Sequence, residues 1–172
     1  QVPESWKNAE DEGLFTPEVK GGRKEVVDFV KNIQAKVNAQ EGNTLPVSAF
    51  TEYVDGSTPS GSSAYEKRGI AVDIPVWKPE NCIQCNRCAY VCPHAVIRPV
   101  ALTEEELAKA PEGIETIDMI GMPGMKFTMT VSAYDCTGCG SCANVCPGKK
   151  GEKALVMENM EANAGKQDYF DF

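Results

Sequence analysis

The sequence predicts an α+β fold made of two similar halves, with an insertion between the halves and an N-terminal extension. Eight cysteines in two groups of identical spacing indicate the repeat, and short strand-like and helix-like segments flank both groups. A leading segment with one amphipathic helix precedes them. We therefore expect a leading segment at 1–72 and a cysteine-bearing domain at 73–172, with the insertion at about 98–125.

The leading segment contains one predicted helix at about 23–41. Its apolar residues recur at the spacing of one helical face, and Gly42 follows as a typical helix end. These residues are Val26, Val30, Ile33 and Val37. Residues 1–22 are polar and contain two prolines, so we expect them to form a strap between domains.

Composition and charge exclude several classes of function. The 172 residues carry a formal net charge of −8, whereas nucleic-acid binders present basic faces. No apolar run reaches the roughly 18 residues that span a bilayer, and no secretory signal opens the chain. We therefore expect a cytoplasmic protein that binds neither nucleic acid nor membrane. Because the first residue is Gln1, we expect a piece of a longer chain or a processed subunit.

The cysteines form two copies of C-x-x-C-x-x-C-x-x-x-C-P. The groups are Cys82, Cys85, Cys88 and Cys92, and Cys136, Cys139, Cys142 and Cys146. A disulfide protein spreads its cysteines along the chain, and structural zinc favours separated C-x-x-C pairs. A triplet at spacing three, followed by Cys-Pro, is instead typical of two [4Fe–4S] clusters. A structural zinc module remains the alternative from another class.

In the bacterial two-cluster pattern the fourth cysteine of each motif binds the other cluster. This rule assigns one ligand set to Cys82, Cys85, Cys88 and Cys146. It assigns the other set to Cys136, Cys139, Cys142 and Cys92. The crossing predicts that neither cluster assembles properly without both halves of the chain.

Residues around the motifs have their own expected roles. The stretch from the third to the fourth cysteine predicts a helical turn, with Val91 and Val145 facing the interior. Phe127 to Tyr134 alternates like a strand, and Ile74 to Trp77 is expected to be an edge strand because of its proline. Thr103 begins a capping box, which predicts a short helix from Glu104 to Ala110.

Other side chains near the motifs are expected to assist rather than to bind iron. The eight cysteines already fill both clusters, so His94 is expected near a cluster or at the surface. Tyr90 and Tyr134 are expected to shield a cluster from water. Five basic residues provide either ordinary solvated charge or a local rim that docks an acidic partner: Arg87, Arg98, Lys149, Lys150 and Lys153.

The repeat resembles the bacterial two-[4Fe–4S] ferredoxin fold, and this resemblance implies that the two halves are related by a pseudo-twofold axis. A more specific resemblance begins upstream, with Leu45-Pro-Val-Ser-Ala-Phe50, Asp55-Gly56 and Tyr65-Glu-Lys-Arg-Gly-Ile-Ala71. It continues with Pro79-Glu-Asn-Cys-Ile-Gln-Cys85, Val91-Cys-Pro-His-Ala95 and Ile97-Arg-Pro99. These phrases, in this order, resemble the internal ferredoxin-like domain of pyruvate:ferredoxin oxidoreductase and the segment leading into it, over about 45–166.

The resemblance implies a much longer, typically homodimeric enzyme that converts pyruvate and coenzyme A to acetyl-CoA and CO2. Its thiamine diphosphate, Mg2+, coenzyme A site and third, proximal [4Fe–4S] cluster would lie in other domains. This chain would supply the medial and distal clusters and relay single electrons to ferredoxin or flavodoxin, without being an enzyme by itself. The alternatives are the cluster domain of another 2-oxoacid oxidoreductase and a free-standing two-cluster ferredoxin.

Overall fold

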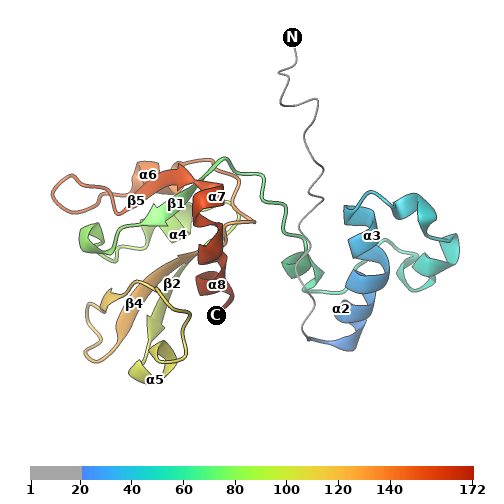
Figure 1. Cartoon of the computed structure of the whole chain (residues 1–172), viewed down its shortest axis with the longest axis horizontal. Helices are drawn as coiled ribbons and strands as arrows, with labels where there is room; N and C mark the ends of the chain where they lie inside the picture. The colour runs from blue at the N-terminus through green and yellow to red at the C-terminus, as the bar shows by residue number, and fades with distance from the viewer. Residues whose placement is uncertain (1–20) are drawn as a thin grey trace, which may run out of the picture. The chain divides into compact units, whose positions relative to one another are not determined.

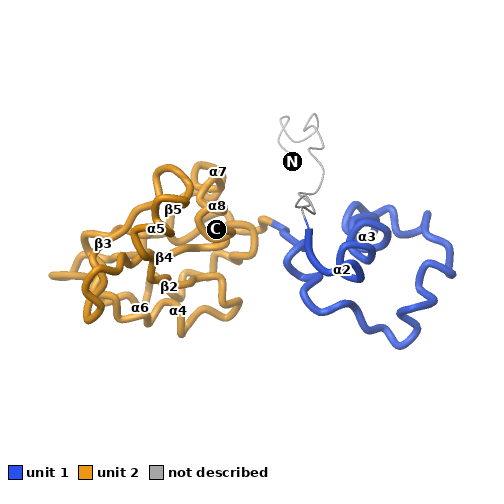
Figure 2. The backbone as a smooth tube through the Cα atoms, turned by 90° about the horizontal axis from the view of Figure 1, so that it is seen from below, with its two compact units in different colours: residues 1–68 blue, residues 69–172 orange. Residues whose placement is uncertain are grey.

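The computed structural model describes residues 21–172, which fall into two compact units that divide between Arg68 and Gly69 (Figures 1 and 2). The expected strap at 1–22 lies almost wholly outside the described residues. No helix in the described part of the chain is long and apolar enough to cross a membrane.

The first unit contains one continuous helix followed by short 3-10 turns. The helix comprises α2 (Lys24–Phe29), a π-helical turn (Val30–Gln34) and α3 (Ala35–Asn38). The 3-10 turns are Gly42–Thr44, Val47–Tyr53 and Ser62–Tyr65. The buried face carries Val26, Phe29, Val30 and Ile33, and Leu45, Tyr53 and Tyr65 pack against it.

The π-helical turn explains why one predicted core position is wrong. Val37 was expected on the buried face, but half of its surface is exposed (50%). A π-helical turn contains an additional residue, which rotates every later side chain relative to the face that precedes it. Gln34, within this turn, is buried and donates from Nε2 to the carbonyl of Ser62 at 3.1 Å.

The second unit is built on two small antiparallel sheets. One sheet pairs β1 (Asp73–Trp77) with β5 (Leu155–Asn159). The other has the order β2-β4-β3, formed by Ile97–Leu102, Lys126–Val131 and Ile117–Asp118. Residues 98–102 therefore belong to a paired strand, and 103–125 connect β2 to β4. We keep the name insertion for 103–125.

Short helices carry the third cysteine of each motif and close the chain. α4 (Arg87–Val91) and α6 (Ser141–Val145) pack against each other. In the insertion, α5 (Glu104–Leu107) begins with the predicted capping box: Glu106 N donates to Thr103 Oγ1 at 3.2 Å, and Thr103 N donates to Glu106 Oε2 at 2.8 Å. α7 (Met160–Asn163), a 3-10 turn (Ala164–Lys166) and α8 (Gln167–Asp171) complete the fold.

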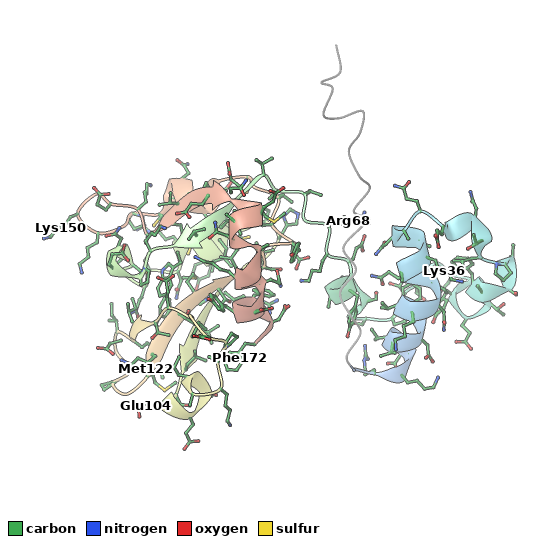
Figure 3. All side chains as sticks on the ribbon, in the orientation of Figure 1. Lys36, Arg68, Glu104, Met122, Lys150 and Phe172 are labelled. Atoms are coloured by element: carbon green, nitrogen blue, oxygen red, sulfur yellow. The ribbon has the colours of Figure 1, made fainter. Side chains whose placement is uncertain are left out.

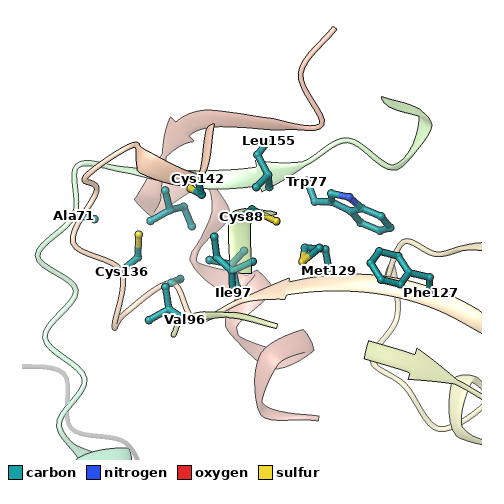
Figure 4. Packing of buried hydrophobic residues seen from close by; sticks show 13 residues of the cluster. Ala71, Trp77, Cys88, Val96, Ile97, Phe127, Met129, Cys136, Cys142 and Leu155 are labelled. Atoms are coloured by element: carbon teal, nitrogen blue, oxygen red, sulfur yellow. The ribbon is translucent and has the colours of Figure 1, made fainter. Parts of the chain in front are cut away.

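The apolar core of the second unit lies between the two sheets. Trp77 of β1 meets Phe127 of β4 with ring centroids 6.0 Å apart, and Met129 lies beside them (Figure 4). Three cysteines are buried in the same core: Cys88, Cys136 and Cys142. The hydrophobic interior and the candidate metal ligands are therefore one packing unit.

One expectation about a buried side chain is wrong, and one strand is buried on both faces. Val91 was expected to face the interior but is exposed by 37%. The alternating strand β4 buries both of its faces, because Thr128 and Thr130 are covered as well. Their cover is the C-terminal segment: α8 contacts β4, and Gln167 Oε1 accepts from the backbone N–H of Tyr134 at 3.3 Å.

Gly148 is a glycine that the fold requires. Its φ is +61°, and a Cβ there would lie 1.8 Å from the carbonyl oxygen of Glu152. Gly121, at φ +81°, has open space around it and is the matched control. We expect Gly148→Ala to lower the anaerobic unfolding temperature by about 10 °C or more and Gly121→Ala by about half as much or less. Equal losses in circular-dichroism melts would contradict the close approach.

Candidate metal centres

The first cavity is surrounded by four cysteines from both motifs. Cys82 and Cys85 lie in the loop after a 3-10 turn (Pro79–Asn81), Cys88 lies in α4, and Cys146 directly follows α6. Together with apolar residues of β1, β4 and β5 they line about 330 Å³ of space not occupied by protein atoms. Cys146 therefore joins the motif to which it does not belong in sequence.

The second cavity has the reciprocal composition and nearly the same size. Cys136 and Cys139 lie in the loop after β4, Cys142 lies in α6, and Cys92 directly follows α4. These residues line about 320 Å³, with Pro75, Val96 and Ile97 supplying apolar wall. The structure thus brings the eight cysteines together in two groups of four, each with members from both motifs.

Left-handed backbone conformations shape both ligand loops. In the first loop Gln84 and Asn86 have φ of 55° and 57°, and in the second Gly138 and Gly140 have φ of 70° and 72°. This geometry turns backbone N–H groups toward sulfur. Gln84 N donates to Cys82 Sγ, and Gly138 N donates to Cys136 Sγ, both at 3.4 Å. Such bonds stabilise a thiolate and its metal complex.

Burial makes the third cysteine of each motif hard to ionise by itself. Removal from water raises the pKa of Cys88 and of Cys142 to about 11, and burial also raises the pKa of Cys136. Several thiolates within one buried cavity repel one another and lack the hydration of water. A positively charged iron–sulfur core would supply the missing counter-charge, so these cavities fit a metal centre better than free thiolates.

Cys139 has the opposite environment, because it is exposed. The backbone N–H of Ser141, and secondarily the Ser141 hydroxyl 3.6 Å from Cys139 Sγ, lower the pKa of this thiol. Its counterpart Cys85 is exposed as well. Each group of four therefore combines buried cysteines with one that reaches the surface.

One unpartnered donor is consistent with a bound group in the first cavity. Trp77 Nε1 is buried without a hydrogen-bond partner, and Trp77 lines this cavity. A buried N–H without an acceptor is rare unless a ligand or water provides one. A sulfur-rich cluster offers acceptors to Trp77. Within residues 21–172, no three His, Cys, Asp or Glu side chains converge closely enough to hold a single metal ion.

Other predicted site residues have mixed outcomes. His94 lies in the wall of the second cavity, beside the cysteines rather than in place of one. Tyr90 was expected to shield a cluster, but 89% of its surface is exposed. Arg98 lies over the ring of Phe170, with Cζ 4.6 Å from its centroid.

Sequence reasoning missed Trp77 and the structural role of Lys153. Lys153 Nζ donates to the carbonyls of Asn144 at 2.9 Å and Cys146 at 2.6 Å, so it binds the end of α6 beside a candidate ligand. A cation at a helix C-terminus satisfies carbonyls that lack partners within the helix. The signal in the sequence was the position of Lys153 shortly after Cys146.

Comparison with known proteins agrees with this geometry. Residues 81–150 match the family described as 4Fe-4S dicluster domain, and residues 17–71 match EKR, a domain of unknown function. The chain is 50% identical over 163 residues to the pyruvate:ferredoxin oxidoreductase of Moorella thermoacetica, which covers 94% of this chain and 13% of that protein.

Two further relatives extend the comparison. The pyruvate-flavodoxin oxidoreductase of Enterobacter agglomerans is 44% identical over 171 residues, which is 99% of this chain and 14% of that protein. The mitochondrial pyruvate dehydrogenase [NADP(+)] of Euglena gracilis is 44% identical over 148 residues, which is 86% of this chain and 8% of that protein. The chain therefore spans a small part of the length of these relatives.

The different cysteine environments predict an order of alkylation. In the reduced, iron-free chain at pH 8, Cys139 should react with iodoacetamide at least about tenfold faster than Cys88 and Cys142, because the reactive thiolate is populated mainly where the pKa is low and the sulfur accessible. Ser141→Ala should slow the alkylation of Cys139 and leave the alkylation rates of Cys88 and Cys142 unchanged. Peptide mapping by mass spectrometry gives the rates, and equal rates for the three cysteines in a chain that circular dichroism shows to be folded would refute the assigned environments.

Proposed function

We propose that the chain is an electron-transfer module holding two [4Fe–4S] clusters. Residues 81–150 match the 4Fe–4S dicluster domain family, and most of the chain corresponds to one segment of pyruvate:ferredoxin and pyruvate-flavodoxin oxidoreductases. The observation that carries the proposal is the pair of cavities, each lined by four cysteines from both motifs. Each cluster, when bound, supplies a reversible one-electron couple.

The ligands of the first cluster are Cys82, Cys85, Cys88 and Cys146, and those of the second are Cys136, Cys139, Cys142 and Cys92. The surrounding residues hold these sulfurs in place: N–H groups of the left-handed loops donate to the first cysteine of each motif, and Ala154 N donates to Cys146 Sγ at 3.4 Å. The paired loops and helices support a bacterial-type ferredoxin fold whose halves are related by a pseudo-twofold axis.

Within the parent enzyme, the chain provides the medial and distal clusters. Thiamine diphosphate, Mg2+, coenzyme A and the proximal cluster belong to other parts of a homodimeric, cytoplasmic pyruvate oxidoreductase, so this chain by itself performs no bond chemistry. The leading segment, 1–72, connects the cluster domain, 73–172, to the rest of the enzyme. A division of the chain into two units supports this arrangement, although it falls four residues earlier, between Arg68 and Gly69. The wall of each cavity excludes water from the buried sulfurs.

The chain delivers electrons to ferredoxin or flavodoxin. The names of the relatives differ in their acceptor, which is ferredoxin, flavodoxin or NADP(+), although all of them contain the same segment. This supports a relay shared by enzymes with different acceptors. Lys149 and Lys150 are exposed in the turn that follows Cys146, where a negatively charged carrier can approach the first cavity (Figure 3).

Serine variants test the clusters and their crossed ligands. The anaerobically reconstituted chain should contain about eight iron and eight sulfide per chain. Cys88→Ser and Cys146→Ser should each weaken the first cluster, so their reduced forms should share one electron paramagnetic resonance spectrum. Cys142→Ser and Cys92→Ser should share the complementary spectrum. If Cys88→Ser instead resembled Cys92→Ser, each motif would bind its own cluster, and zinc without iron would refute the function.

Charge reversal tests the docking of the acceptor. Lys149→Glu with Lys150→Glu should reduce electron transfer from the reduced chain to ferredoxin by about tenfold at low salt and flatten its dependence on ionic strength. Lys36→Glu with Lys31→Glu, both exposed in the first unit, is the control and should change neither. An unchanged rate and salt slope in the first variant would contradict docking at this turn.

A further inference from the structure

One glutamine joins the first cysteine motif to the insertion. Gln84 lies between Cys82 and Cys85, and its side-chain amide makes two hydrogen bonds with the backbone of 118–120. Nε2 donates to the carbonyl of Asp118 at 2.7 Å, and Oε1 accepts from the N–H of Ile120 at 2.9 Å. The amide therefore pairs with this segment as a neighbouring strand would.

The segment that Gln84 holds is also fixed on its other sides. β3, which ends at Asp118, pairs with β4, and Met119 N donates to the carbonyl of Met125 at 3.0 Å. The Met119 side chain packs against the apolar core. Ile120 itself is 69% exposed, so the hydrogen bond from its N–H to Gln84 is not a consequence of burial. Gln84 thus binds the backbone of 118–120, while β4 and Met125 bind neighbouring backbone groups of the same segment.

The backbone of Gln84 takes part in the candidate metal centre. Its φ is 55°, a left-handed conformation that side chains other than Gly and Asn adopt at an energetic cost, and its N–H donates to Cys82 Sγ. Gly138 occupies the corresponding place in the second motif without that cost. There a Cβ would lie 3.1 Å from the carbonyl of Asp73, which leaves little room for a side chain.

The two motifs therefore differ in their surroundings at this position. No residue of the insertion lines the first cavity, so the insertion does not enclose the metal centre directly. Its hydrogen-bonded connection to the ligand loop is the Gln84 side chain. Gln84 has a strained backbone at a position where the other motif has glycine, and both its amide oxygen and its amide nitrogen form hydrogen bonds. This combination indicates that the side chain has a function.

We propose that Gln84 is a positioning residue that fastens the insertion to the ligand loop of the first cluster. By holding 118–120 against the loop, it keeps the Gln84 N–H directed at Cys82 Sγ and restricts opening of the loop to water. The proposal rests on the proposed function, because it assumes a cluster in the first cavity. It assigns the insertion to the first cluster and leaves the second without an equivalent fastening.

Two variants remove the amide contacts in different ways. Gln84→Asn retains an amide and tolerates the left-handed conformation but is too short to reach both backbone groups. Gln84→Gly removes the side chain and the strain together. In the cluster-loaded chain, both should accelerate hydrogen exchange at Ile120 N–H about tenfold, as expected for the loss of two hydrogen bonds. Both should also release half of the iron to a chelator several-fold faster.

The proposal is tested by which of the two clusters loses its iron quickly. The spectrum that remains after the fast release should be that of the second cluster, as defined by Cys88→Ser and Cys146→Ser. Asp118→Asn is the matched control, because it breaks the ion pair with Lys126 Nζ at 2.6 Å but keeps the backbone carbonyl that Gln84 uses. It should leave both exchange and iron release unchanged.

Three outcomes would overturn the proposal: unchanged exchange at Ile120, unchanged iron release, or equal acceleration of both halves, which indicates general destabilisation. Failure of the proposed function is a separate result, since the unsubstituted chain would then bind no iron–sulfide clusters in the first place.

Discussion

The rest of the second unit depends on the exchange of one cysteine between the two motifs. Cys146 closes the cavity of the first motif and Cys92 closes that of the second, so α4 and α6 must pack against each other for either group of four to form. Three other cysteines of the two groups are part of the apolar core: Cys88, Cys136 and Cys142 are buried among Trp77, Met129 and Leu155. Burial disfavours their thiolates, and only a positive core can compensate several of them in so small a space. Folding and metal binding are therefore expected to be strongly coupled.

The two ligand loops adopt the same backbone conformation with different residues. Both ligand loops need left-handed backbone to turn N–H groups toward sulfur, and the second loop uses glycines where the first uses Gln84 and Asn86. The difference follows from the neighbours. The start of β1 leaves little room for a Cβ at Gly138, whereas the insertion lies beside Gln84 and offers backbone groups to its amide. Similarity of sequence between the halves thus coexists with different surroundings.

The features that the sequence predicted are those fixed by local spacing. Cysteines three residues apart, the Thr103–Glu106 capping box and the edge strand containing Pro75 all follow from neighbouring residues. The features that it could not predict depend on distant partners. β5 forms a sheet by pairing with the distant β1. The burial of Thr128 and Thr130 depends on α8, which begins more than thirty residues later. Val37 was misplaced because a single π-helical turn changes the register of a face, and no residue type reports that turn.

The exposure of Cys85 and Cys139 has a consequence for the direction of electron transfer. One cysteine of each group reaches the surface, while the two groups meet inside the unit through α4 and α6. Each group of four therefore has one cysteine at the surface, where an electron donor or an electron acceptor can approach. Access to the surface alone therefore does not set a direction for electron transfer. Whether electrons run from the first centre to the second or in reverse is set by the potentials of the centres and by which partner occupies each end.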